Sequence, residues 1–161
     1  DRQDKPDEAI VAYNDLLAGK ISNPSRIHYK LGLIHEEQGK QQDAAKAFRR
    51  VLETYDRDIR PLPEHAVESH YRLGEVLYNN KRYSQAINAL KTARELFPDH
   101  SSRAWADYLI AQAYSATKNE NAALAEMRAM TKPERPDDLF KSVAQTNLKL
   151  RDWEKQFKDV L

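Results

Sequence analysis

The chain of 161 residues contains no cysteine, and this absence excludes disulfide bonds, thiolate metal sites and cysteine nucleophiles. Glycine is also scarce, with 4 residues, and most of the glycines and of the 7 prolines lie near predicted turns. No apolar run approaches the roughly 18 residues that a membrane-spanning helix needs. The sequence therefore predicts no direct membrane insertion and no glycine-rich phosphate loop, whereas its 40% apolar content is enough for a substantial core.

A strong charge of either sign is missing as well. The 26 basic and 25 acidic side chains give a formal net charge of +1, which supplies no long-range field for nucleic acid or an anionic membrane. Short basic pairs occur at Arg49-Arg50 and Lys81-Arg82, but acidic residues interleave with them and no basic stripe develops. We interpret these pairs as solvated surface and expect no nucleic-acid partner.

Catalytic and metal-binding patterns are incomplete. The segment from His35 to Gly39 begins like the helix of a zinc protease, but Gly39 stands where the second histidine ligand must be. We interpret His28, His35 and His70 as partly buried spacers and not as metal ligands. No Gly-x-Ser-x-Gly nucleophile motif occurs. We therefore expect no enzymatic activity, no catalytic residues, no metal and no cofactor.

A regular arrangement of small residues is present instead. In each unit a small residue follows an apolar one, and twelve positions later comes an alanine, or glutamine in the last unit. A large apolar residue follows four positions after that. The pairs are Gly32 and Ala44, Gly74 and Ala86, Ala111 and Ala123, and Ala144 and Gln156. Such a period predicts an array of antiparallel helix pairs, because small side chains let two helices approach closely.

The intervals between the small residues identify the connections. They are 42, 37 and 33 residues, against about 34 for one common helical repeat. The surplus in the first interval falls at 57–63, where Pro61 and Pro63 forbid a continuous helix. We expect a lengthened surface loop between repeats there, and a functional insertion is the alternative.

The second full unit carries the clearest family pattern. It contains Tyr71-Arg72-Leu73-Gly74, then Leu77, Tyr83-Ser84-Gln85-Ala86, Leu90, Ala93 and Pro98. With its counterparts in the other units, this pattern resembles the tetratricopeptide repeat family over nearly the whole chain. The resemblance implies an all-α fold, a right-handed α-solenoid of antiparallel helix pairs in a single domain, 1–161. We expect repeats at 25–58, 64–98 and 101–133, the second helix of a partial repeat at 5–19, and a degenerate or truncated repeat at 137–161.

Both ends of the chain interrupt a repeat. Ala9, Tyr13 and Leu16 match the second-helix pattern without a first helix before them, so we expect the chain to be a piece of a longer protein. Exposed packing faces at these residues, or at Trp153, Phe157 and Val160, would permit self-association through the terminal repeats.

The first helices of such an array line its concave wall. On them, the positions −6, −3, +1 and +4 from each small residue form a face separate from the packing face. Tyr29, Tyr71 and Tyr108 share position −3 and would form a ladder of phenols that suits a peptide or helix. The alternative is that these rings wedge between neighbouring helices.

The predicted partner-binding residues lie on this face or beside it. They are Tyr29, Lys30, Leu33, Glu68, Tyr71, Arg72, Glu75, Tyr78, Trp105, Tyr108 and Gln112. One subset of the family holds the carboxylate end of chaperone tails with lysine and asparagine. This sequence instead has tyrosine at −3 and Leu33 and Glu75 at +1, which favours an internal segment or a helix of the partner.

The resemblance implies a protein–protein interaction scaffold that binds a peptide or helix of another protein in its concave groove. Two alternatives stay open: a regulatory or substrate-presenting domain of a larger, enzymatic protein, and a self-assembling repeat module. The long proline-containing connection, the tyrosine-rich first helices and the segment 98–101 resemble bacterial repeat proteins of the cell envelope, which makes the periplasm the expected compartment over the cytoplasm.

Overall fold

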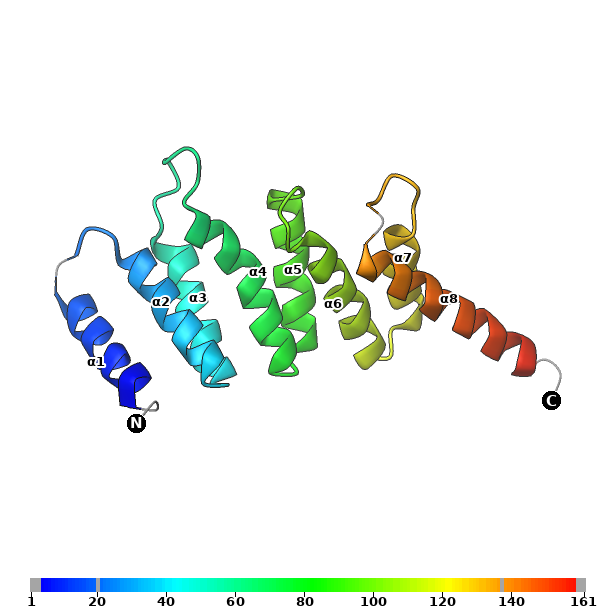
Figure 1. Ribbon diagram of the computed structural model, residues 1–161, viewed down its shortest axis with the longest axis horizontal. Helices are drawn as coiled ribbons and strands as arrows, with labels where there is room; N and C mark the ends of the chain where they lie inside the picture. Colours follow the sequence, from blue (N-terminus) through cyan, green and yellow to red (C-terminus); the bar gives the residue numbers. More distant parts are fainter. Residues whose placement is uncertain (1–3, 20, 137, 159–161) are drawn as a thin grey trace.

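A computed structural model describes residues 4–19, 21–136 and 138–158 of the chain (Figure 1). Within these ranges the chain forms eight α-helices and no strand. The helices are α1 (Asp4–Ala18), α2 (Pro24–Glu37), α3 (Gln41–Thr54), α4 (Glu64–Asn79), α5 (Tyr83–Leu96), α6 (Arg103–Ala116), α7 (Glu120–Met130) and α8 (Leu139–Lys158). The prediction of an all-α solenoid is confirmed.

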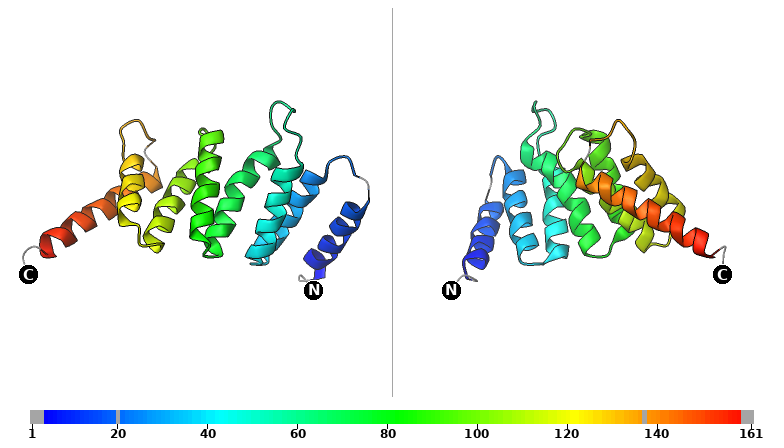
Figure 2. Two further views of the ribbon diagram at one scale, coloured as in Figure 1. Left: turned by 180° about the vertical axis from the view of Figure 1, so that it is seen from behind. Right: turned by 45° about the vertical axis from the view of Figure 1, so that its right-hand side comes forward.

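The helices pack in two rows along an elongated array. α2 and α3, α4 and α5, and α6 and α7 form antiparallel hairpins, with α1 before them and α8 after them (Figures 1 and 2). The backbones of α2 and α4, of α4 and α6, and of α6 and α8 approach closely. α3 and α5, and α5 and α7, lie farther apart in the described ranges and meet only through long side chains, as in the pair of Arg94 and Glu126. The row of α2, α4, α6 and α8 is therefore the tighter, inner one.

The hydrophobic core runs from hairpin to hairpin. Phe48 on α3 belongs to one buried cluster with Leu73 and Val76 on α4, so the second helix of one hairpin packs on the first helix of the next. Further clusters join α4 and α5 to α6, and α6 and α7 to α8. Because each cluster spans more than one hairpin, no hairpin buries its apolar face by itself.

The small residues make room for large ones within each hairpin. A Cβ on Gly32 would lie 2.6 Å from Cε1 of Phe48, and a Cβ on Gly74 would lie 2.4 Å from Cγ of Leu90. In the third hairpin, Ala111 packs in one cluster with Met127. Each glycine thus leaves room for the large apolar residue sixteen positions later. This role adds to the one expected from the sequence, in which glycine and the alanine twelve positions later let the two helices approach closely.

The turns inside the three hairpins share one backbone conformation. The residue seven positions after each small residue has a positive φ: 70° at Gly39, 58° at Lys81 and 59° at Lys118. Each of these turns contains the same pair of hydrogen bonds, which satisfies the last carbonyl groups of the first helix. The longer bonds join Lys40 N to His35 O at 2.8 Å, Arg82 N to Leu77 O at 2.9 Å and Asn119 N to Tyr114 O at 2.9 Å.

Charged side chains are buried between the second and third hairpins. The Asp107 side chain, 6% exposed, accepts hydrogen bonds from Arg94 at 2.9 Å and from Arg135 at 2.6 Å, and Arg103 lies 3.7 Å away. Arg94 also pairs with Glu126 at 2.7 Å. Since Arg135 lies between α7 and α8, this network ties that connection to α6.

The connections between hairpins differ in length. Residues 55–63 join α3 to α4 and are mostly exposed, whereas residues 97–102 suffice between α5 and α6. α8 packs on α6 and α7 through Phe140, Ala144 and Leu148. The side chains of Gln156, Trp153, Phe157 and Val160, which entered the terminal-repeat predictions, lie outside the described residues.

Candidate partner-binding groove

An ion cluster joins α2 to α4 on the inner row. The Arg72 guanidinium donates Nη1–H bonds to Glu36 Oε1 at 3.2 Å and Oε2 at 3.3 Å, and its Nε donates to Glu68 Oε1 at 3.0 Å. All three side chains are partly buried, with exposed fractions of 35% for Arg72, 18% for Glu36 and 27% for Glu68. The cluster therefore fixes the orientation of these charges at the surface formed by α2, α4, α6 and α8, which is called the groove from here on.

Tyr29 completes this cluster from α2. Its hydroxyl donates to Glu68 Oε2 at 2.5 Å, and its ring packs on Phe48 and His65 at centroid distances of 6.2 and 6.0 Å. Burial and the hydrogen bond to Glu68 raise the pKa of Tyr29. Burial opposes ionisation of Glu68, but the hydrogen bonds from Tyr29 and Arg72 outweigh it and lower the pKa of this carboxyl. Glu68 is therefore ionised at neutral pH.

Glu36 experiences the opposite balance. Burial raises the pKa of its carboxyl, and Arg72 offsets that effect only in part because the carboxylates of Glu75 and Glu68 also lie nearby. Negative charge thus exceeds positive charge around Glu36.

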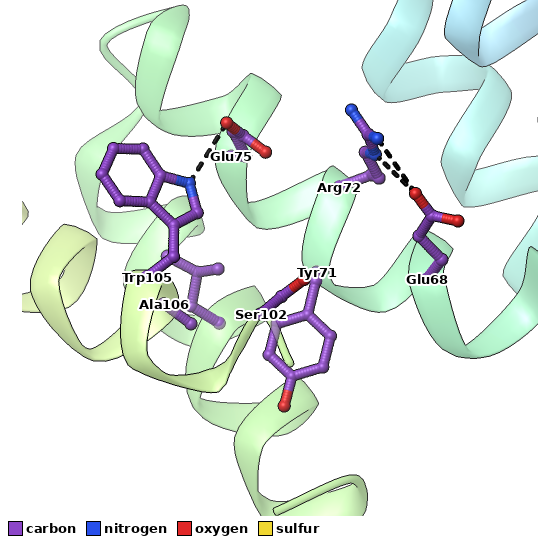
Figure 3. A pocket seen from close by; sticks show the side chains of 8 residues that line it. Glu68, Tyr71, Arg72, Glu75, Ser102, Trp105 and Ala106 are labelled. Atoms are coloured by element: carbon purple, nitrogen blue, oxygen red, sulfur yellow. Dashed lines mark hydrogen bonds and ion pairs between the residues drawn. The ribbon is translucent and has the colours of Figure 1, made fainter. Parts of the chain in front are cut away.

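An aromatic cluster follows on α6 and α8. The Trp105 indole stacks on Tyr108 at a centroid distance of 5.5 Å, and Phe140 lies 5.5 Å from Trp105 and 5.7 Å from Tyr108. Trp105 Nε1 donates to Glu75 Oε1 at 3.1 Å, which links the cluster to α4 (Figure 3). Sequence reasoning missed Phe140, because its position, four before Ala144, belongs to the packing face of a first helix.

Two cavities open between the first helices. A cavity of about 290 Å³ lies between α4 and α6, and one of about 210 Å³ lies between α2 and α4. The lining of the first is Glu68, Tyr71, Arg72, Glu75, Leu90, Ser102, Trp105 and Ala106. The second is lined by Arg26, Tyr29, Lys30, Glu64, His65 and Glu68. The two cavities share Glu68, so they form neighbouring depressions of one surface.

The three tyrosines at the shared position differ in their surroundings. Tyr71 is only 4% exposed, its hydroxyl donates to Phe97 O at 2.7 Å, and its ring stacks on His100 at 4.8 Å. Figure 3 shows its ring directed away from Glu75 and Trp105. These contacts favour the packing alternative for Tyr71, whereas Tyr29 and Tyr108 are half-buried on the groove side.

The remaining predicted residues are distributed along the same row. Lys30 is exposed beside the smaller cavity, and Leu33 is half-buried against the cluster around Phe48. Tyr78 packs edge-on against Tyr83 at 5.5 Å, and Gln112 is half-buried on α6. The structure therefore brings Glu68, Tyr71, Arg72, Glu75 and Trp105 together at one cavity. Tyr29 and Lys30 line the neighbouring cavity, and the others are distributed along the same row.

No group of three or more histidine, aspartate or glutamate side chains among the described residues is arranged to hold a metal ion. Within those ranges no helix combines the length and apolarity needed to traverse a bilayer.

Stacked helical hairpins with partly exposed side chains along the inner row are typical of helical-repeat proteins. Residues 1–59 and 67–100 each match a tetratricopeptide repeat sequence profile. The chain belongs to the tetratricopeptide repeat family. Repeats of this family act as protein-interaction scaffolds, so the prediction of an interaction scaffold in general is confirmed. The family is typically non-enzymatic.

Solved structures give the same architecture. A chain described as "MamA 41-end from Desulfovibrio magneticus RS-1" is similar with a TM-score of 0.62 and 24% identity, over 96% of this chain and 89% of that one. A chain described as "MamA RS-1 ArsTM double mutant" is similar with a TM-score of 0.61 and 26% identity over 78% of this chain, which spans 64% of the length of that one. No curated protein matches the sequence significantly.

Proposed function

We propose that the inner row of helices binds a peptide or helical segment of a partner protein. The observation that carries the proposal is that groove side chains are held in place by contacts between helices. Tyr29 is held by Glu68, Arg72 by Glu36, and Trp105 by Glu75. Side chains that are already ordered lose little conformational entropy on binding, which favours recognition.

The proposed contact residues surround the two cavities. They are Tyr29, Lys30, Leu33, Glu68, Arg72, Glu75, Tyr78, Trp105, Tyr108 and Gln112, with Tyr71 supporting the wall from behind. Aromatic side chains and arginine carry most of the free energy in many protein interfaces. The Trp105 and Tyr108 rings supply such area beside charged groups that set the orientation of a partner.

The test compares two double variants in affinity capture from the native source. Glu75→Lys with Lys30→Glu reverses two charges of the groove, whereas Arg49→Ala with Gln85→Ala removes an exposed hydrogen bond between α3 and α5. We expect the groove variant to weaken capture at least about tenfold and the control variant to retain it. Circular dichroism and the melting temperature establish that both variants are folded. If the folded groove variant captured the partner as well as the parent protein does, the proposed binding surface would be refuted.

Self-association is the second candidate, and exposed apolar residues on α1 favour it. Val11 is 60% exposed and Leu16 is 50% exposed. A helix with exposed apolar residues of this kind is suited to pack on another copy of the chain. Light scattering over a concentration series tests this candidate, and a constant monomer mass at high concentration would contradict it.

A further inference from the structure

Negative charge exceeds positive charge at the centre of the groove. Glu36, Glu68 and Glu75 all act electrostatically on Arg72, which is the cation that pairs with the first two. The cluster thus carries a formal charge of −2. Arg26 and Lys30 lie with Glu64 at the smaller cavity. Because the cluster is partly buried, its field is screened less than that of exposed side chains.

Glu75 has hydrogen-bonding capacity left over. Its Oε1 accepts from the Trp105 indole, but no donor bonds to its Oε2 in the part of the chain that the structure describes. Both oxygens of Glu68, in contrast, already accept hydrogen bonds from Tyr29 and Arg72. A carboxylate has about four acceptor sites, so Glu75 is the position where an incoming cation gains most.

The cavity next to Glu75 has room for one side chain. Its volume of about 290 Å³ lies just below the range of roughly 300–1,000 Å³ typical of small-molecule sites. Glu75 and Trp105 form one side of it (Figure 3). Arg72 also contributes to the lining, but its guanidinium bonds to Glu36 and Glu68. The cavity therefore combines an acceptor with an aromatic face.

An apolar surface continues from this cavity. Trp105, Tyr108 and Phe140 form one aromatic cluster across α6 and α8, and all three are half-buried. Aromatic rings make two kinds of contact: they pack against apolar side chains, and their faces stack with guanidinium groups. The groove thus changes from acidic at α4 to aromatic at α6 and α8.

We propose, on the basis of the groove function above, that the occupant is a partner segment in which an arginine is followed closely by an apolar or aromatic residue. The arginine enters the cavity between α4 and α6, donates to Glu75 Oε2 and stacks on Trp105. The apolar residue covers Tyr108 and Phe140. Arginine fits better than lysine because its planar guanidinium can stack on the indole while it donates a hydrogen bond to the carboxylate.

A phage-displayed library of random twelve-residue peptides provides the probe. We expect selection on the immobilised chain to enrich arginine next to apolar or aromatic residues. In fluorescence polarisation with one selected, labelled peptide, replacing its arginine by lysine should weaken binding several-fold, and replacing it by glutamate at least about tenfold. Raising the salt concentration should weaken binding as well.

Protein variants assign the effect to the cavity. Glu75→Gln should weaken the peptide about tenfold, whereas Glu53→Gln, on the exposed end of α3, should leave its affinity unchanged. Glu75→Arg should reject the arginine peptide and bind the peptide in which glutamate replaces arginine. This charge exchange distinguishes direct contact from a loss of fold.

The outcomes separate this inference from the function on which it rests. Selected peptides that are acidic or uncharged, and that compete for the groove, would overturn the arginine assignment and leave groove binding intact. Unchanged affinity of Glu75→Gln for an arginine peptide would do the same. A selection without binders, or binders insensitive to both Glu75→Arg and the Glu75→Lys, Lys30→Glu variant, would overturn both. Concentration-dependent dimer formation that Glu75→Gln abolishes would identify a second copy as the occupant and overturn the arginine assignment.

Discussion

The ring of Phe48 fills the space next to Gly32, so closely that a Cβ on the glycine would lie 2.6 Å from Cε1 of the ring. Phe48 is fully buried and also packs on α4 through the cluster that contains Leu73. The ring therefore has little freedom to move away. This one relationship sets how closely α2 and α3 approach and connects the first hairpin to the second.

Gly32→Ala should destabilise the protein by about 1–3 kcal/mol because the new methyl group overlaps the Phe48 ring. Alanine in place of glycine inside an unobstructed helix would instead stabilise by roughly 0.5–1 kcal/mol. Urea denaturation measures the free energy of unfolding. The double variant Gly32→Ala, Phe48→Met serves as the control because it reproduces the pairing of Ala111 with Met127 in the third hairpin. In this background Gly32→Ala should add little to the cost of Phe48→Met alone. A more stable Gly32→Ala protein would show that the hairpin accommodates the methyl group.

Tyr71→Ala should destabilise the protein by about 3 kcal/mol or more because the buried ring leaves a cavity. Tyr71→Phe keeps the ring and loses only the hydrogen bond to Phe97 O, at a cost of about 1 kcal/mol. Thermal unfolding followed by circular dichroism measures both. If Tyr71→Ala melted like the parent protein, the assignment of this ring to packing would be wrong.

Asp107→Ala should be among the most damaging substitutions, with a loss of about 3 kcal/mol or more, because Arg94 and Arg135 would lose a buried anionic partner. The matched control is Glu53→Ala, whose pair with Arg50 is exposed and should contribute less than about 1 kcal/mol. Urea midpoints at low and moderate salt measure the difference. Equal effects of the two substitutions would contradict the structural role of the buried network.

Stability should fall as the pH is lowered from 7.5 to 5.5. Burial lowers the pKa values of His28, His35, His65 and His70 below the ordinary value of about 6.5. Between that value and the lowered ones, the unfolded chain binds more protons than the folded chain, so acidification favours unfolding. The urea midpoint at each pH measures the effect.

His70 offers a specific control for this pH dependence. Its Nε2 is buried without a hydrogen-bond partner in the described structure, and its ring packs on Phe97 at 5.2 Å. His70→Leu should therefore reduce the change in urea midpoint between the two pH values. An unchanged pH dependence in this variant would exclude His70 as one of the responsible groups.

Part of the arrangement of residues around the cavity between α4 and α6 could be predicted from the sequence, but its details could not. Helical periodicity placed Glu68, Glu75 and Trp105 on one face, and the structure brings them to one cavity. The same periodicity treated Tyr71 like Tyr29, although Tyr71 reaches the turn after α5 and is buried there. A position on a helix gives the direction of a side chain, but its neighbours from other hairpins decide whether it is covered.

The sequence by itself determined the repeat and hence the array. Small residues at fixed intervals allow helices to pair closely. Because this requirement is local to each hairpin, the spacing can be recognised in one amino-acid sequence. Only the tertiary structure decided which charges pair. Arg72 meets Glu36 of the preceding hairpin, and Arg135 reaches Asp107. Such pairs join residues far apart in sequence, and no periodicity specifies them, because they depend on how one hairpin is positioned against the next.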